Sequence, residues 1–166
     1  MEELEVKAQE KAEKLVELLN KNSMHISFAE SCTGGLLAKL ITDVSGASNV
    51  FECGFVTYSN RIKTEVLHIP TSFIEQYGVV SSEVAGRMAK AAREKSSADI
   101  GIGITGVAGP GPDGSIPEGT IYIGFSVKNK ETTMAMFTGT ENQRNYNRYC
   151  AAINAFSMAI EYLENI

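Results

Sequence analysis

Hydrophobic residues recur every three to four positions in some stretches of the chain and form short, β-branched runs in others. The first spacing places apolar side chains on one face of a helix, whereas short apolar runs are typical of buried strands. Helices are therefore expected at residues 3–21, 34–41, 60–67, 71–77, 82–95 and 142–163. Strands are expected at residues 24–29, 50–58, 100–105, 119–127 and 132–137.

Strands and helices alternate through most of the chain, which is typical of a sheet covered by helices on both faces. The last two strands follow one another around Asn129 and predict an antiparallel hairpin, so the sheet should be mixed. We therefore expect an α/β fold, a three-layer α/β/α sandwich with a mixed β-sheet. At 166 residues, the chain should form a single domain over residues 1–166.

Composition argues against several classes of protein. A net charge of -5 disfavours binding to nucleic acid or to a membrane surface, both of which need a basic face. Cys32, Cys53 and Cys150 are widely spaced and odd in number, so neither a disulfide framework nor a zinc site is indicated. The acidic N-terminus lacks the apolar region of a signal peptide, and no apolar run approaches a membrane span. A cytoplasmic protein is expected.

The segment Phe28-Ala-Glu-Ser-Cys-Thr-Gly-Gly-Leu-Leu-Ala38 is the most informative part of the chain, because a strand ends and a helix begins within it. Ser31 falls at the junction, beside the free N–H groups of the new helix. These donors, near Thr33, Gly34 and Gly35, are expected to hold a substrate oxyanion or phosphate. Ser31 is thus either a nucleophile or, like Thr33, a helix cap. Cys32 is a second candidate nucleophile, ranked lower because it lacks an obvious histidine partner.

A serine nucleophile needs a base, and the two histidines, His25 and His68, are expected in structural or surface positions. A lysine with a lowered pKa is the alternative base. Lys63 follows a strand end by a few residues, so it and Tyr58 could face one crevice. Arg61 could lower the pKa of Lys63 or hold an anion; otherwise both cations belong to a solvated helix start.

Residues 106–118 form a loop rich in glycine and proline. Glycines allow backbone N–H groups to approach a ligand closely, so Gly106 and Gly109 are candidate binding residues. Thr105 precedes this loop at a strand end, where open α/β sheets bind ligands. The loop is long for a mere connection, although that remains the alternative. Asp113 is a single loop carboxylate without the partners that a metal site needs.

Six segments, in order along the chain, resemble the CinA C-terminal domain family, which includes nicotinamide-nucleotide amidohydrolases. They are Ala29-Glu-Ser-Cys-Thr-Gly-Gly-Leu36, Val44-Ser-Gly-Ala-Ser48, Gly54-Phe-Val-Thr-Tyr-Ser-Asn60 followed by Lys63, Gly78-Val-Val-Ser81, Gly103-Ile-Thr-Gly-Val-Ala-Gly-Pro110 and Pro117-Glu-Gly-Thr-Ile-Tyr-Ile-Gly124. One segment alone would be weak evidence. Six in order make the resemblance specific over most of the chain.

The resemblance implies hydrolysis of the carboxamide of nicotinamide mononucleotide to nicotinate mononucleotide and ammonia, with no metal or other cofactor. The partner would be this small molecule rather than nucleic acid or a membrane. By the same resemblance, Ser31 is the nucleophile and Lys63 its base, Tyr58 belongs to the catalytic group, and Thr105 lines the site.

One motif departs from the family. Members often carry Gly-Asp-Arg and then a second arginine before the last helix, where this chain has Gly139-Thr-Glu-Asn-Gln-Arg144. Glu141 takes the place of the first arginine, and Arg144 stands about one position from the second. Arg144 is expected to hold the substrate phosphate from a shifted helix start. A non-catalytic nucleotide-sensing domain is the alternative function. The apolar hairpin and last helix suggest a homo-oligomer, most simply a dimer.

Overall fold

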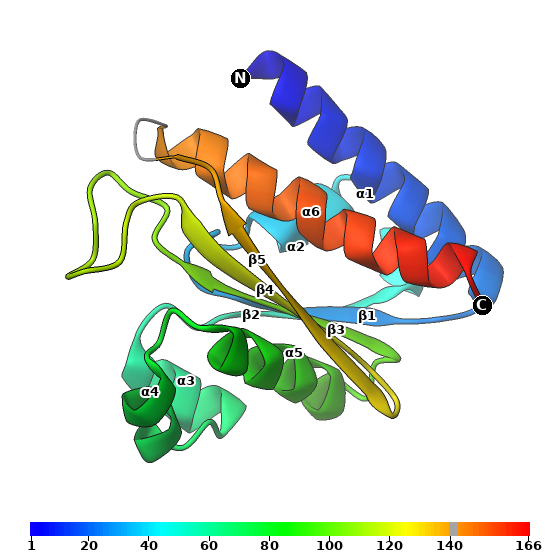
Figure 1. The fold of residues 1–166 in the computed structure, drawn as a ribbon. Helices are drawn as coiled ribbons and strands as arrows, with labels where there is room; N and C mark the ends of the chain where they lie inside the picture. The colour runs from blue at the N-terminus through cyan, green and yellow to red at the C-terminus, as the bar shows by residue number, and fades with distance from the viewer. Residues whose placement is uncertain (140–142) are drawn as a thin grey trace.

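The computed structural model describes residues 1–139 and 143–166. Within these residues, a five-stranded sheet with strand order β2-β1-β3-β4-β5 forms the centre of the molecule (Figure 1). Strand β1 pairs in parallel with β2 and β3, whereas β4 pairs antiparallel with β3 and β5. The strands are β1 (Ile26–Glu30), β2 (Phe51–Val56), β3 (Ile100–Gly106), β4 (Thr120–Val127) and β5 (Lys130–Phe137).

Helices cover both faces of this sheet (Figure 1). On one face, α1 packs against α6 and α2; on the other, α5 lies across β1, β3 and β4 and carries α3 and α4 on its outer side. The helices are α1 (Glu2–Asn22), α2 (Leu36–Thr42), α3 (Asn60–Leu67), α4 (Thr71–Tyr77), α5 (Ser82–Ser96) and α6 (Arg144–Glu164). The three-layer α/β/α sandwich with a mixed sheet is therefore confirmed.

The alternation of isoleucine and glycine in β3 explains how two layers pack against one strand. Ile100, Ile102 and Ile104 are fully buried in the larger core, beneath α1 and α6. The intervening glycines face α5, and a Cβ atom on Gly103 would lie 2.4 Å from the Ala85 carbonyl oxygen. Because no side chain intervenes, the backbone of α5 rests directly on the sheet.

Element boundaries differ from the sequence prediction in a few places. The second strand ends at Val56 rather than at residue 58, which leaves Tyr58 in a loop. Strand β5 begins two residues earlier than expected, because a two-residue turn with Asn129 at a positive φ of 68° lets Val127 pair with Lys130. The predicted start of the last helix at residue 142 lies outside the described residues, and α6 is described from Arg144 onward.

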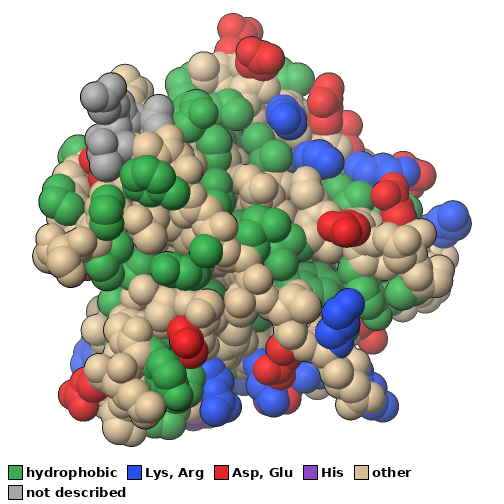
Figure 2. Space-filling model, viewed as in Figure 1, with side chains coloured by type: hydrophobic (Ala, Val, Ile, Leu, Met, Phe, Trp, Pro, Cys, Tyr) green, Lys and Arg blue, Asp and Glu red, His purple; other side chains and the backbone are tan. Residues whose placement is uncertain are grey.

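Hydrophobic side chains gather across the centre of one face of the molecule, over β5 and α6, while charged side chains lie mostly around it (Figure 2). Strand β5 is the edge of the sheet, and Phe137 at its end is 61 % exposed. This is the face on which the sequence suggests a dimer, and the dimer stays a prediction. None of the described helices is both long enough and apolar enough to cross a bilayer.

Because β1, β2 and β3 are parallel, their carboxyl ends lie at the same edge of the sheet. The turn after β1, the loop after β2 and the loop after β3 all leave the sheet there, and α6 begins beside them (Figure 1). Open α/β sheets place ligands at such an edge.

Candidate active site

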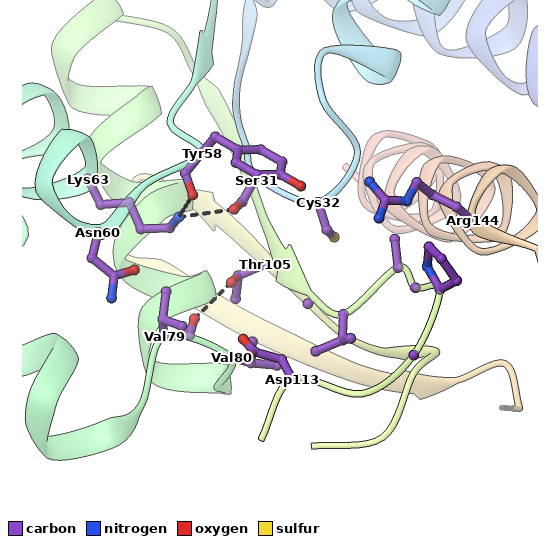
Figure 3. A pocket seen from close by; sticks show the side chains of 16 residues that line it. Ser31, Cys32, Tyr58, Asn60, Lys63, Val79, Val80, Thr105, Asp113 and Arg144 are labelled. Atoms are coloured by element: carbon purple, nitrogen blue, oxygen red, sulfur yellow. Dashed lines mark hydrogen bonds between the residues drawn. The ribbon is translucent and has the colours of Figure 1, made fainter. Parts of the chain in front are cut away.

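A cavity of about 350 Å³ lies at this edge of the sheet (Figure 3). Its walls come from the turn after β1, the start of α3 with the loop before it, the loop after β3, and the first residue of α6. The structure brings seven of the predicted site residues together on these walls: Ser31, Tyr58, Lys63, Thr105, Gly106, Gly109 and Arg144.

Lys63 is the most unusual residue of the cavity, because its side chain is fully buried. Helix α3 begins after Ser59, whose hydroxyl accepts the Ile62 N–H at 3.2 Å, and this cap fixes the start of the helix that carries Lys63. The Lys63 Nζ lies 3.0 Å from Ser31 Oγ, 2.7 Å from the Thr57 carbonyl oxygen and 3.3 Å from the Tyr58 carbonyl oxygen (Figure 3).

Burial lowers the pKa of Lys63 from 10.5 to about 8, because a charged ammonium loses its hydration in this position. In the ammonium form, three N–H groups face three acceptors. In the neutral form, two N–H groups stay on the Thr57 and Tyr58 carbonyl oxygens, and the lone pair faces the Ser31 hydroxyl. The geometry therefore satisfies both protonation states and places Lys63 to accept a proton from Ser31.

Arg61 does not take part in this arrangement. Its guanidinium lies 2.6 Å from the exposed Glu65 carboxylate on the outer face of α3, and Arg61 does not line the cavity. The pKa of Lys63 is lowered by burial rather than by this neighbouring cation. The expectation that Arg61 lowers the pKa of Lys63 or holds an anion in the cavity is therefore wrong. Arg61 is a surface cation, whereas Lys63 is not.

Ser31 and Cys32 both line the cavity, but their chemistry differs. Ser31 follows β1 directly, and its N–H donates to the Ile104 carbonyl oxygen at 3.0 Å, which ties the residue to the end of β3. Burial raises the pKa of the Cys32 thiol from 9.0 to about 12. A thiol that stays protonated at neutral pH is a poor nucleophile, so the geometry favours Ser31 over Cys32.

The first N–H groups of α2 are already occupied by a buried side chain. Glu30, which is 1 % exposed, accepts N–H groups from Gly35 at 3.0 Å, Leu37 at 3.1 Å and Ala38 at 3.0 Å. The Gly34 N–H donates to the Ser31 carbonyl oxygen at 3.0 Å. These donors cannot hold a substrate anion while they serve the protein itself.

The structure thus corrects the anion site expected at this helix end. Thr33, Gly34 and Gly35 line a separate cavity with Arg148, outside the one that contains Ser31. Sequence reasoning missed Glu30, although an acidic residue just before a predicted helix start was an available signal.

Helix α6 secures two walls of the cavity. The Arg148 Nε donates to the Cys32 carbonyl oxygen at 2.8 Å, and the Asn147 Nδ2 donates to the Ala108 carbonyl oxygen at 3.0 Å. Arg144, one turn earlier on the same helix, lies on the cavity wall (Figure 3). Asn147 and Arg148 are therefore positioning residues, and nothing in their local sequence indicated it.

Buried side chains fix the conformation of the loop after β3, so it is more than a connecting segment. The buried Glu118 carboxylate accepts the Gly111 N–H at 2.5 Å, and a Cβ atom on Gly109 would lie 2.3 Å from the Glu118 side chain. The Thr105 hydroxyl donates to the Val79 carbonyl oxygen at 2.8 Å, which joins the end of β3 to the segment before α5.

Both histidines lie away from the cavity, as expected. His25 lies between Glu52, at 3.7 Å, and Asp99, at 3.6 Å, and His68 ends α3 with a positive φ of 56°. In the described part of the chain, no group of three histidine, cysteine or acidic side chains is placed to hold a metal ion.

Comparison with known proteins identifies similar chains. The family model of the CinA C-terminal domain matches residues 8–163. A putative competence-damage inducible protein of Caldanaerobacter subterraneus subsp. tengcongensis is 41% identical over 157 residues, which are 94% of this chain and 38% of that protein. A protein of the same description from Thermoanaerobacter pseudethanolicus is 48% identical over 126 residues, which are 75% of this chain and 30% of that protein. The chain spans about a third of the length of these curated relatives.

Solved structures show the same fold. The crystal structure of competence/damage inducible protein CihA from Agrobacterium tumefaciens has a TM-score of 0.89 and 32% identity, covering 93% of this chain and 94% of that one. A CinA superfamily protein from Klebsiella pneumoniae has a TM-score of 0.90 and 25% identity, covering 96% of this chain and 99% of that one.

The burial of Lys63 predicts a pH-dependent stability. Between pH 8 and 10.5 the amine is neutral in the folded protein and charged in the unfolded chain, so unfolding takes up a proton. The free energy of unfolding of the wild type should therefore rise with pH in this window relative to Lys63→Met. Below pH 8, the amine is charged in both the folded and the unfolded protein, so the difference in free energy of unfolding between the wild type and Lys63→Met should be constant. Urea unfolding of both proteins from pH 7 to 10 measures it. Ser31→Ala, which keeps the amine buried, should follow the wild type; a flat difference for Lys63→Met would contradict the lowered pKa.

The Glu30 carboxylate predicts a large loss of stability for an isosteric change. Glu30→Gln removes the charge at the start of α2 and places an NH₂ group where an oxygen accepted, so the cost should be about 1.5–3 kcal/mol. Glu83→Gln is the matched control, because Glu83 lies in the first turn of α5 but is exposed. Its cost should stay within about 0.5 kcal/mol. Equal losses in urea unfolding of the two variants would show that Glu30 does not hold the turn.

Proposed function

The chain belongs to the CinA C-terminal domain family, and we propose that it hydrolyses the carboxamide of nicotinamide mononucleotide, releasing nicotinate mononucleotide and ammonia. One observation carries the proposal: a buried lysine amine lies 3.0 Å from the hydroxyl of a serine on the wall of a cavity. A serine activated by an adjacent base is the arrangement that acyl transfer requires. The resemblance of six sequence segments to nicotinamide-nucleotide amidohydrolases supplies the substrate.

In this reaction, neutral Lys63 takes the proton of Ser31 as Oγ attacks the carboxamide carbon. The resulting ammonium gives the proton to the departing nitrogen, and ammonia leaves an acyl-serine. Water then attacks the ester, with Lys63 again accepting a proton, and nicotinate mononucleotide is released. Because the Thr57 and Tyr58 carbonyl oxygens keep two N–H groups, the remaining position of the Lys63 nitrogen, a lone pair or the transferred proton, stays directed at Ser31 throughout.

The pKa of Lys63 fits this role. With a pKa of about 8, about a tenth of the protein carries the neutral amine at pH 7. A lysine with its ordinary pKa would be almost wholly protonated there. Lys63 is buried and has no carboxylate partner among the described residues. A lysine in such a position can act as a base near neutral pH.

Two other residues would place the substrate. Tyr58 is 62 % exposed, and its ring lies beside Ser31 in Figure 3, where it can cover a pyridine ring. Arg144 begins the 21-residue helix α6 and lies on the cavity wall, so its guanidinium and the N-terminus of α6 can act together on the phosphate. The altered family motif at Glu141 lies outside the described residues.

The decisive measurement is ammonia release from nicotinamide mononucleotide by the purified protein. Ser31→Ala removes the attacking oxygen, so it should lower turnover by about a thousandfold or more while the nucleotide still binds. Cys32→Ala is the matched control and should keep most of the activity, because its thiol is protonated at neutral pH. Binding without ammonia release by the wild type would favour the alternative of a non-catalytic nucleotide-binding domain. Unchanged turnover in Ser31→Ala would remove Ser31 from the mechanism.

Removal of the Arg144 side chain should weaken binding of the substrate phosphate and leave the rest of the substrate contacts unchanged. Arg144→Ala loses a charge-assisted contact, so KM for the mononucleotide should rise about tenfold or more, whereas hydrolysis of the poorer riboside should hardly change. Arg61→Ala is the control, because this arginine pairs with Glu65 outside the cavity. Steady-state kinetics on both substrates measure the effect, and equal losses on mononucleotide and riboside would show that Arg144 does not hold the phosphate.

A further inference from the structure

The cavity holds one charged side chain that the mechanism above does not use. Among the described residues, the charged side chains on its walls are Lys63, Arg144 and Asp113. Asp113 belongs to the loop after β3, and Figure 3 shows it below Thr105, on the other side of that residue from Ser31. Asp113 and Ser31 thus line the same cavity from opposite sides of Thr105.

The backbone holds Asp113 in place. Its N–H donates to the Ile116 carbonyl oxygen at 3.0 Å, and the Ile116 N–H donates back to the Asp113 carbonyl oxygen at 3.0 Å. This reciprocal pair closes the tip of the loop into a tight turn. Asp113 is thus presented by a defined backbone rather than by a loose end.

The carboxylate of Asp113 has no partner of its own within residues 1–139 and 143–166. It forms neither an ion pair nor a side-chain hydrogen bond there, although Arg144 lines the same cavity. Some exposed carboxylates elsewhere, such as Asp43 with Lys39 and Glu65 with Arg61, lie against cations, whereas the exposed Asp113 does not. An unpaired negative charge on a binding wall favours a ligand with positive charge nearby.

A second feature of the cavity favours the same charge. The exposed ring of Tyr58 offers an aromatic face, which attracts cations through its quadrupole. Tyr58 and Asp113 come from different loops and line the same cavity; Figure 3 shows Tyr58 beside Ser31 and Asp113 beyond Thr105. The cavity thus carries two groups that prefer a cation, Tyr58 and Asp113, as well as the cationic Lys63 at Ser31 and Arg144 beyond Cys32.

We propose that Asp113 selects the oxidised, positively charged pyridinium ring against the neutral dihydropyridine ring of the same nucleotide. The choice of a pyridine nucleotide as ligand rests on the proposed function; the selection by ring charge goes beyond it. With the carboxamide at Ser31 and the phosphate at Arg144, the ring lies on the Tyr58 and Asp113 side. Reduction of the ring removes its charge and leaves the phosphate and ribose unchanged, so it isolates the contribution of Asp113.

The test measures binding rather than turnover. Calorimetric titration of Ser31→Ala at pH 7.5 with nicotinamide mononucleotide and with its dihydro form gives two dissociation constants. The oxidised form should bind about three- to fivefold more tightly, the range expected for a partly solvated charge pair. Adding Asp113→Asn should remove most of this preference by weakening the oxidised form alone. Asp43→Asn, an exposed aspartate at the end of α2 outside the cavity, is the control and should keep the preference.

The outcomes separate this proposal from the proposed function. Equal weakening of both ring states by Asp113→Asn would indicate a contact with ribose and overturn selection by charge, as would an unchanged preference. Ammonia release by the wild type together with either result would leave the amidohydrolase standing and remove this proposal alone. A preference that depends on Asp113 in a protein that releases no ammonia would support the charge selection and overturn the amidohydrolase. Failure of both ring states to bind would overturn both.

Discussion

The contact between the Lys63 amine and its three oxygen partners is the constraint around which the cavity is built. A buried amine needs every one of its hydrogen-bond positions satisfied, and its partners come from two places, the turn after β1 and the loop after β2. The end of β1, the end of β2 and the start of α3 must therefore hold a fixed relation. A small shift of any of them would leave a buried polar group unpaired. The same contact that restrains these elements also sets the protonation of Lys63. A change in the position of these elements would therefore also change the acid–base behaviour of the site.

Much of the fold and part of the site follow from local patterns. The two hydrophobic spacings predicted the six α-helices and five strands that the structure describes, because amphipathic faces are encoded over a few turns, but not the single 3-10 turn at Ala47–Asn49. Ser31 and Thr105 were each expected at a strand end, and both line the cavity because the carboxyl ends of parallel strands meet at one edge of the sheet. Lys63 was harder. Its local sequence fits a solvated helix start as well as a buried base, and the inward direction of the first turn depends on how α3 packs.

The remaining features depend on contacts that no local pattern records. Arg148 reaches the Cys32 carbonyl oxygen across 116 positions, and Asn147 reaches that of Ala108 across 39. Glu30 ends a strand that is buried throughout, and although an acidic residue before a helix start was a signal, the local pattern does not tell which N–H groups its carboxylate meets. The Arg61 error was avoidable, because Glu65 stands four positions later on the same helix, at the spacing of a surface ion pair.

The two contacts made by α6 have a consequence for the order in which the protein becomes complete. A ribosome makes Ser31 and Lys63 before α6, and domains generally fold as units once their elements have emerged. Until α6 arrives, the Cys32 and Ala108 carbonyl oxygens lack the side chains that hold them, and the apolar face of α1 that packs against α6 has no cover. While the segment between Lys63 and α6 is being made, the nascent chain thus carries Ser31 without the contacts that α6 adds to the cavity walls. Assembly of the site has to wait for α6 and is joined to closure of the core rather than to the appearance of Ser31 and Lys63.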